Sequence, residues 1–184
     1  MSGFTTSCRT RGTGAAGHRW NGSGPWRLTG RQPMDEHILP TDFKEFLRLL
    51  NEFNVRYLLI GGYAVGYHGY PRATADMDVW VAVSPDNAAR LVDVFRRFGM
   101  DDPDLQPGIF LQRGKIIRMG IPPMRIEVLT KIDGVDFAEC YAARVSSEID
   151  GEKVNIISRQ HLRRNKIAAG RYKDLDDLEN LAGD

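Results

Sequence analysis

The chain has 184 residues, 42% of them hydrophobic, with 25 basic and 24 acidic residues and a formal net charge of +1. This length and apolar content suit one domain with a sizeable core. No apolar stretch reaches the roughly 18 residues of a membrane span, and the amino terminus lacks a compact hydrophobic signal, so we expect a cytoplasmic protein that does not contact a membrane. Two cysteines, Cys8 and Cys140, support neither a disulfide framework nor a zinc cluster.

Residues 1–33 differ in character from the remainder of the chain. They contain five arginines and no acidic residue, which leaves 25 − 5 = 20 basic against 24 acidic residues and a net charge of −4 elsewhere. Gly, Ser and Thr are frequent there without helical or strand periodicity, so we expect this segment to be disordered. It is either a basic arm for nucleic acid or upstream sequence before a start at Met34. We favour the second reading because Met34 directly precedes the first periodic segment.

Residues 34–184 are predicted to form one α+β domain, a mixed sheet flanked by helices. Thr41 is expected to cap an amphipathic helix that reaches Phe53, and the apolar residues 57–60 predict a buried strand. Gly61 and Gly62 then predict a turn, followed by a short helix over 63–69 whose amino end offers unpaired N–H groups to an anion. After Pro71 breaks the chain, a strand is predicted over 77–83.

The second half is expected to extend the same sheet. Ser84 and Pro85 predict the start of a helix that ends near Gly99. A polar loop over 101–108 follows it. Further strands are predicted at 109–112, 115–119 and 125–129, a short helix at 136–141, a hairpin of 145–149 with 154–157 around Asp150 and Gly151, a helix from Ser158 toward Gly170, and a final acidic helix whose charges are mostly solvated.

Asp76 and Asp78 are the most informative residues, because they stand at the head of an apolar run behind the double glycine. Side chains two apart on a strand share a face, with Cα atoms roughly 6.5 Å apart. Two acids so placed can hold a divalent ion, while the glycine segment offers a seat for phosphate. The combination indicates chemistry on a metal-bound nucleoside triphosphate.

Glu127 is a lone acid in the apolar strand 125–129. It is either a third metal carboxylate, brought beside the aspartates by strand pairing, or an exposed residue paired with Arg125 or Lys131. We favour the metal role because the two aspartates are present.

Four other polar or aromatic residues near these segments have competing interpretations. The sequence is equally consistent with two positions for Lys166: its charge could face the cleft that binds the triphosphate, or it could lie on the surface. His68 and Trp80 are predicted to be structural, and Arg171 is spaced for an ion pair with Asp174.

The pattern resembles the signature of the nucleotidyltransferase superfamily, the DNA polymerase β-like fold, which pairs a Gly-Gly or Gly-Ser turn with an Asp-x-Asp strand. The strings GGYAVGYHGYPRATADMD and KIAAGRYKDLDDLENL are similar to small bacterial members, namely the abortive-infection type IV toxin nucleotidyltransferases and the minimal nucleotidyltransferases of toxin–antitoxin pairs. The resemblance covers about residues 40–182. One departure is Glu127, because the family usually has aspartate as the third acid.

The resemblance implies that Asp76 and Asp78 ligate Mg²⁺ on the triphosphate, and that Glu127 joins them at a second Mg²⁺ and helps to deprotonate the acceptor. The residues expected to contact the nucleotide or to orient the aspartates are Gly61, Gly62, Arg72, Thr74 and Lys166. The implied activity is Mg²⁺-dependent transfer of a nucleoside monophosphate from a triphosphate to an acceptor hydroxyl on RNA, a protein or a small molecule, in a toxin–antitoxin setting with a partner protein. The alternatives are a catalytically silent partner of a toxin–antitoxin pair and a nucleic-acid binder with a basic arm.

Overall fold

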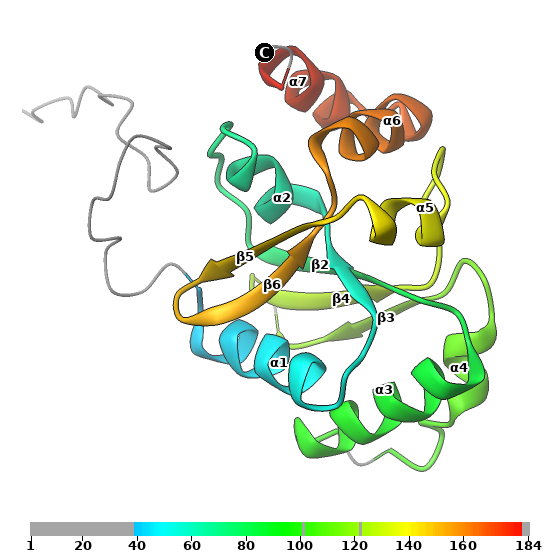
Figure 1. Cartoon of the computed structure of the whole chain (residues 1–184). Coiled ribbons are helices and arrows are strands. Elements are labelled where there is room, and N and C mark those ends of the chain that lie inside the picture. The colour runs from blue at the N-terminus through cyan, green and yellow to red at the C-terminus, as the bar shows by residue number, and fades with distance from the viewer. Residues whose placement is uncertain (1–38, 101, 122, 182–184) are drawn as a thin grey trace, which may run out of the picture.

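The computed structural model describes residues 39–100, 102–121 and 123–181 (Figure 1). The predicted tail at 1–33, with Cys8, and the proposed start at Met34 lie outside these residues. The helices of the described part are α1 (Thr41–Glu52), α2 (Gly61–Tyr67), α3 (Pro85–Arg97), α4 (Pro107–Leu111), α5 (Phe137–Ala142), α6 (Arg159–Ala169) and α7 (Tyr172–Asn180). Its strands are β1 (Tyr57–Leu59), β2 (Asp76–Val81), β3 (Ile116–Met119), β4 (Arg125–Leu129), β5 (Val145–Ile149) and β6 (Glu152–Ile156).

The strands form one six-stranded mixed sheet in the order β3-β4-β2-β1-β6-β5. The pairs β2–β4 and β1–β6 are parallel, and the other neighbours are antiparallel. The α+β class with a mixed sheet and flanking helices, predicted from the sequence, is therefore confirmed. Among the described residues, no helix combines the length and apolar character needed to cross a membrane.

Helices cover the two faces of the sheet unequally. In Figure 1, α1 and α3 pack beneath it, whereas α2, α5, α6 and α7 lie on the opposite side. The lower layer holds much of the core, since Phe46 of α1 contacts Phe95 of α3 edge to face at 5.9 Å and both rings are fully buried.

The alternation along β2 assigns its residues to these two layers. Met77, Val79 and Val81 are fully buried, whereas Asp76 and Asp78 on the other face are only partly buried. This division follows from the period of two along a strand. The acidic pair therefore points away from the aromatic core.

Local sequence signals explain several element boundaries. The Ser84 side chain accepts a hydrogen bond from Asn87 N at the start of α3, and Ser158 does the same for His161 N at the start of α6. Asp150 and Gly151 have φ angles of 55° and 80°, as a two-residue type I′ hairpin turn requires. These caps and the hairpin confirm the sequence predictions.

Three local predictions were wrong. Residues 109–112, predicted as a strand, lie mainly in helix α4, because Pro107 favours a first helical turn and the Phe110 ring packs on Phe95 at 5.2 Å. Thr41 is the first residue of α1, not its cap, and makes no side-chain capping bond. Gly61 does not form a separate turn but opens the first turn of α2.

Candidate functional site

The first turn of α2 lies directly against the acidic strand. Gly61 has a φ of +62°, a conformation that glycine adopts without steric penalty. A Cβ added there would collide with the Asp78 carboxylate, with Asp78 Cγ only 2.7 Å away. Glycine at this position therefore allows the backbone of α2 to contact the Asp78 side chain.

Gly62 makes a second close approach, in this case to Thr74. A Cβ at Gly62 would lie 2.6 Å from Thr74 Oγ1, and that hydroxyl donates a 3.2 Å hydrogen bond to the Asp76 carbonyl oxygen. Thr74 thus links α2 to the beginning of β2. The double glycine has a packing explanation that the sequence did not reveal, since the space beside Gly62 is filled by Thr74.

Strand pairing brings the third acid to the first two. In the parallel register of β2 with β4, Asp78 is aligned with Glu127 and Asp76 with Arg125. Neighbouring strands lie about 4.8 Å apart, and aligned residues of a pair share a face. Glu127 therefore stands beside Asp78, as its proposed metal role requires.

The three carboxylates differ in their partners. Arg125 donates two hydrogen bonds to Asp76, both 3.2 Å long, and Arg118 Nε donates a 2.8 Å hydrogen bond to Glu127 Oε1. Within the described residues, the Asp78 carboxylate has no hydrogen bond and no ion pair. The alternative prediction for Glu127 was an ion pair with Arg125 or Lys131. In the structure its ion-pair partner is Arg118 of β3.

These surroundings change the acidity of Asp78. Burial, followed by the negative charges of Glu127 and Asp76, raises the pKa of Asp78 to about 6. The positive charges of Lys173 and Arg171 act in the opposite direction, but more weakly. Asp78 is thus a partly buried carboxylate whose negative charge is incompletely compensated.

The donor set fits a hard divalent cation in its chemistry. Carboxylate oxygens are the ligands that Mg²⁺ prefers, and a cation at Asp78 would offset the repulsion that raises its pKa. In the ranges that the structure describes, no three acidic, histidine or cysteine side chains are close enough together to hold a metal ion as they stand. To bind a cation, the carboxylates of Asp76 and Glu127 would have to contact it while keeping their hydrogen bonds to Arg125 and Arg118, or those hydrogen bonds would have to break.

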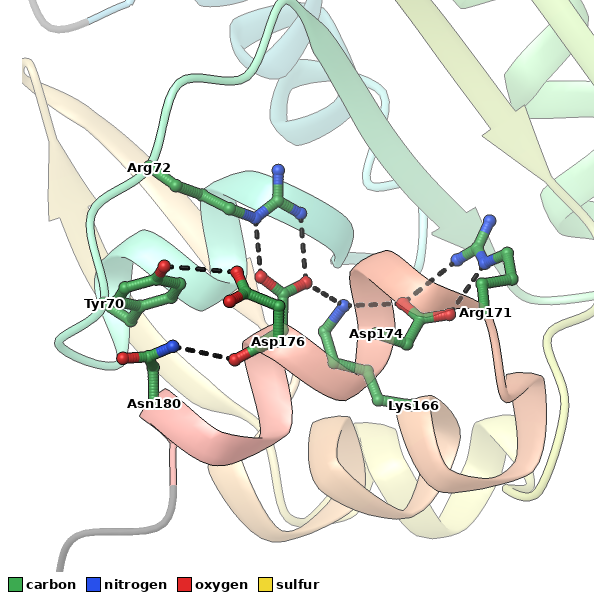
Figure 2. A network of polar contacts seen from close by, with 8 residues as sticks. Tyr70, Arg72, Lys166, Arg171, Asp174, Asp176 and Asn180 are labelled. Atoms are coloured by element: carbon green, nitrogen blue, oxygen red, sulfur yellow. Dashed lines mark hydrogen bonds and ion pairs between the residues drawn. The ribbon is translucent and has the colours of Figure 1, made fainter.

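The cations predicted to meet the nucleotide lie in a different environment from the one expected. Lys166 is 3% exposed, and its Nζ donates hydrogen bonds of 2.9 Å to Asp174 and 2.6 Å to Asp177 (Figure 2). Arg72 donates to the same Asp177 carboxylate through Nε and Nη2, at 2.6 and 3.1 Å. Lys166 therefore joins α6 to α7, and its charge is not directed at Asp78. The predicted pair of Arg171 with Asp174 is confirmed at 2.7 Å.

Sequence reasoning had treated most acidic residues of α7 as solvated. Asp174 and Asp177 are instead 1% and 0% exposed, because this face of the short helix packs on α6. Buried carboxylates require counterions, and Lys166 with the two arginines supplies them. The i,i+3 spacing of the two aspartates, with a lysine one helix earlier, is the signal that could have indicated this network.

Lys173 is the cation that sequence reasoning missed. It lies at the beginning of α7, is exposed, and forms no hydrogen bond or ion pair with another described residue, yet its charge acts on Asp78. Arg72 also retains one free donor, since its buried Nη1 has no partner in the described part of the chain. The exposed Lys173 is therefore better placed to meet an anion than Lys166, whose ammonium is bonded to two carboxylates.

Two structural interpretations are confirmed. His68 Nε2 lies 2.7 Å from the Ile157 carbonyl oxygen, and Trp80, 3% exposed, packs edge to face on Phe137 at 5.0 Å. Neither residue contributes a free base to the acids.

Comparison with known proteins supports the fold assignment. The sequence matches no protein-family model and no curated protein. A candidate nucleotidyltransferase from Thermotoga maritima superposes with a TM-score of 0.51 at 14% identity, over 74% of this chain and 88% of that one. The antibiotic-resistance factor ANT(2'')-Ia superposes with a TM-score of 0.52 at 13% identity, over 77% of this chain and 80% of that one. At such identities the likeness concerns architecture, and the described part of this chain has the nucleotidyltransferase fold that its glycine and aspartate motifs had indicated.

Proposed function

We propose that this protein is a nucleotidyltransferase that transfers a nucleoside monophosphate from a metal-bound nucleoside triphosphate to an acceptor hydroxyl, with release of pyrophosphate. The observation that carries the proposal is the alignment of Asp78 with Glu127 on parallel strands, directly beneath the Gly61 turn of α2. The fold of the solved structures described above supports the same reaction class.

Asp76, Asp78 and Glu127 would hold Mg²⁺ through their carboxylate oxygens, which are the ligands that this ion prefers. When bound, Mg²⁺ would neutralise phosphate charge and stabilise the attacking and leaving oxygens. Asp78 is the primary ligand in this proposal because it alone lacks a competing arginine. Glu127, beside it, would accept the proton of the acceptor hydroxyl, and Arg118 would keep its carboxylate oriented through the 2.8 Å hydrogen bond.

Lys173 would contact the phosphates, while Arg72 would help to hold α7 through its two hydrogen bonds to Asp177. An exposed lysine without a partner can bind a mobile anionic substrate, whereas Lys166 is already neutralised by two carboxylates. Lys166 would act indirectly, by holding α7 so that Lys173 faces the acids.

The acceptor is proposed only as a hydroxyl compound. We include small molecules among the acceptors because the fold is shared with the antibiotic-resistance factor ANT(2'')-Ia, and RNA or protein because the sequence motifs resemble those of toxin nucleotidyltransferases. A toxin–antitoxin partner and a cytoplasmic location remain parts of the same proposal.

One observation favours a second function. Arg125 and Arg118 neutralise two of the three acids, as they would in a catalytically silent protein of the same fold that serves only as a binding partner. In that case Asp76 and Glu127 would be structural ion-pair residues.

The two functions are separated by a labelling experiment. The purified full chain would be incubated with Mg²⁺, each of the four α-labelled triphosphates, and RNA, protein and small-molecule fractions of a cell extract. We expect label in one fraction, and its loss in Asp78→Asn but not in Asp93→Asn, a matched control at an exposed position of α3. Folded protein that labels no fraction with any nucleotide would favour the silent partner.

A further inference from the structure

A pocket lies beside Trp80, away from the acids along the same strand. Trp80 follows Asp78 by two residues and so shares its sheet face, and the pocket that it lines has a volume of about 400 Å³. Small-molecule sites occupy roughly 300 to 1,000 Å³. Its ring-bearing and cationic lining residues are Trp80, Phe137, Tyr141, Arg56, Arg113 and Lys131.

The lining carries a net positive charge. Three cations face one acid, Asp136, so the sum over the lining is 3 − 1 = +2. The Asp136 carboxylate is already engaged, since it accepts hydrogen bonds from the first N–H groups of α5. Arg113 and Lys131 are exposed and have no ion-pair partner among the described residues. The pocket therefore favours an anion.

Trp80 forms part of the aromatic wall of the pocket. Its side chain is 3% exposed, and its indole nitrogen is enclosed by protein atoms, without a hydrogen-bond acceptor in the part of the chain that the structure describes. Phe137 packs edge to face on Trp80 and stacks with Tyr141 at 5.5 Å, and the Arg144 guanidinium lies 4.1 Å from the Tyr141 ring centroid, so this wall of the pocket is a packed aromatic cluster.

We propose that this pocket is a binding site for a small planar aromatic molecule that carries one carboxylate or an equivalent anionic group. The ring would lie against Phe137 and Tyr141, and the anion would be held by Arg113 and Lys131. This site is separate from the acids and does not depend on the transfer reaction.

The test uses 1-naphthoate as the probe and 1-naphthamide as its neutral isostere. In the ¹⁵N-labelled full chain, the Trp80 indole N–H signal is identified among the three tryptophans as the one that Trp80→Phe removes. We expect naphthoate to move this signal to saturation, and naphthamide to bind at least about tenfold more weakly because it lacks the charge. Equal affinity of the two probes, or no saturable shift with naphthoate, would overturn the proposal.

Charge variants locate the bound anion. Arg113→Gln combined with Lys131→Gln should weaken naphthoate roughly tenfold, whereas Arg97→Gln, an exposed position of α3 outside the pocket, should not change its affinity. Asp78→Asn should still bind naphthoate, so failure here is distinguishable from failure of the transferase proposal. If the double variant kept its amide spectrum and its full affinity for naphthoate, the assigned anion site would be wrong.

Discussion

Asp78→Asn is expected to stabilise the fold while abolishing nucleotide transfer. The aspartate is partly buried beside two other carboxylates, and it has no cation bonded to it among the described residues. Asparagine has nearly the same shape without the charge, so the substitution removes the repulsion and leaves the packing against Gly61 in place.

The magnitude follows from the pKa. Its rise from 3.8 to about 6 is roughly two units, and each unit corresponds to about 1.4 kcal/mol. The upper limit is therefore about 3 kcal/mol, and because Asp78 is partly solvated we expect about 1 to 2 kcal/mol at pH 8.

The direction of the Asp78 pKa shift determines how the stability of the fold depends on pH. Because the folded state binds the Asp78 proton more tightly than the unfolded chain, stability contributed by this group falls as the pH rises from about 4 to about 6. Above that window the wild-type protein carries the full penalty, and below it the carboxyl is neutral in both states. The advantage of Asp78→Asn should thus be largest above about pH 7 and absent near pH 4.

Urea unfolding with EDTA, at several pH values between 4 and 8, measures the effect. Asp93→Asn serves as the control and should change the free energy of unfolding by less than about 0.5 kcal/mol. Addition of Mg²⁺ should then stabilise the wild-type protein but not Asp78→Asn. A variant no more stable than wild type at pH 8 in EDTA would refute the reasoning, because it would show that the charge of Asp78 is already compensated.

Three further substitutions distinguish structural from substrate-binding groups. Lys166→Met leaves two buried carboxylates of α7 without their shared ammonium, so unfolding in urea should show a loss of about 3 to 5 kcal/mol. Lys173→Gln should leave the free energy of unfolding within about 0.5 kcal/mol of wild type but raise the KM for the triphosphate in steady-state assays; an unchanged KM would exclude phosphate binding by Lys173. Gly61→Ala should lose at least about 1 kcal/mol and also lose transfer, because a methyl group collides with Asp78. Gly151→Ala, at a φ of +80° with open space around it, is the control that should lose similar stability but keep transfer.

The sequence was most informative where a short-range pattern determines the outcome. The alternation of β2 placed Asp76 and Asp78 on one face and the valines in the core, and Asp150 with Gly151 specified the hairpin. The pairing of Asp78 with Glu127 was less accessible. It depends on the parallel register of β2 and β4, which are separated in the sequence by α3, α4 and β3. The one local signal in the sequence was a single acidic residue in an apolar strand.

Tertiary packing determined what the sequence could not. The apolar run 109–112 is too short for its hydrophobic periodicity to distinguish a strand from a helix. In the structure it lies mainly in helix α4, where Phe110 packs on Phe95. Likewise, a charged residue on a short helix is usually solvated, and only the packing of α6 against α7 buries Lys166 with Asp174.

Asp174 and Asp78 differ in how the rest of the protein compensates their negative charge. Although burial raises the pKa of Asp174, hydrogen bonds from Arg171 and Lys166 lower it overall, as expected for a carboxylate whose role is to hold two helices together. Asp78 is likewise enclosed, but α7 brings Lys173 and Arg171 only near enough to reduce its raised pKa in part. A protein that supplies counterions to one buried carboxylate could supply them to another, and leaving Asp78 without one lowers stability in the absence of a ligand. That loss is understandable if a cation arrives with the substrate, which is why the stability of Asp78→Asn and its activity should change in opposite directions.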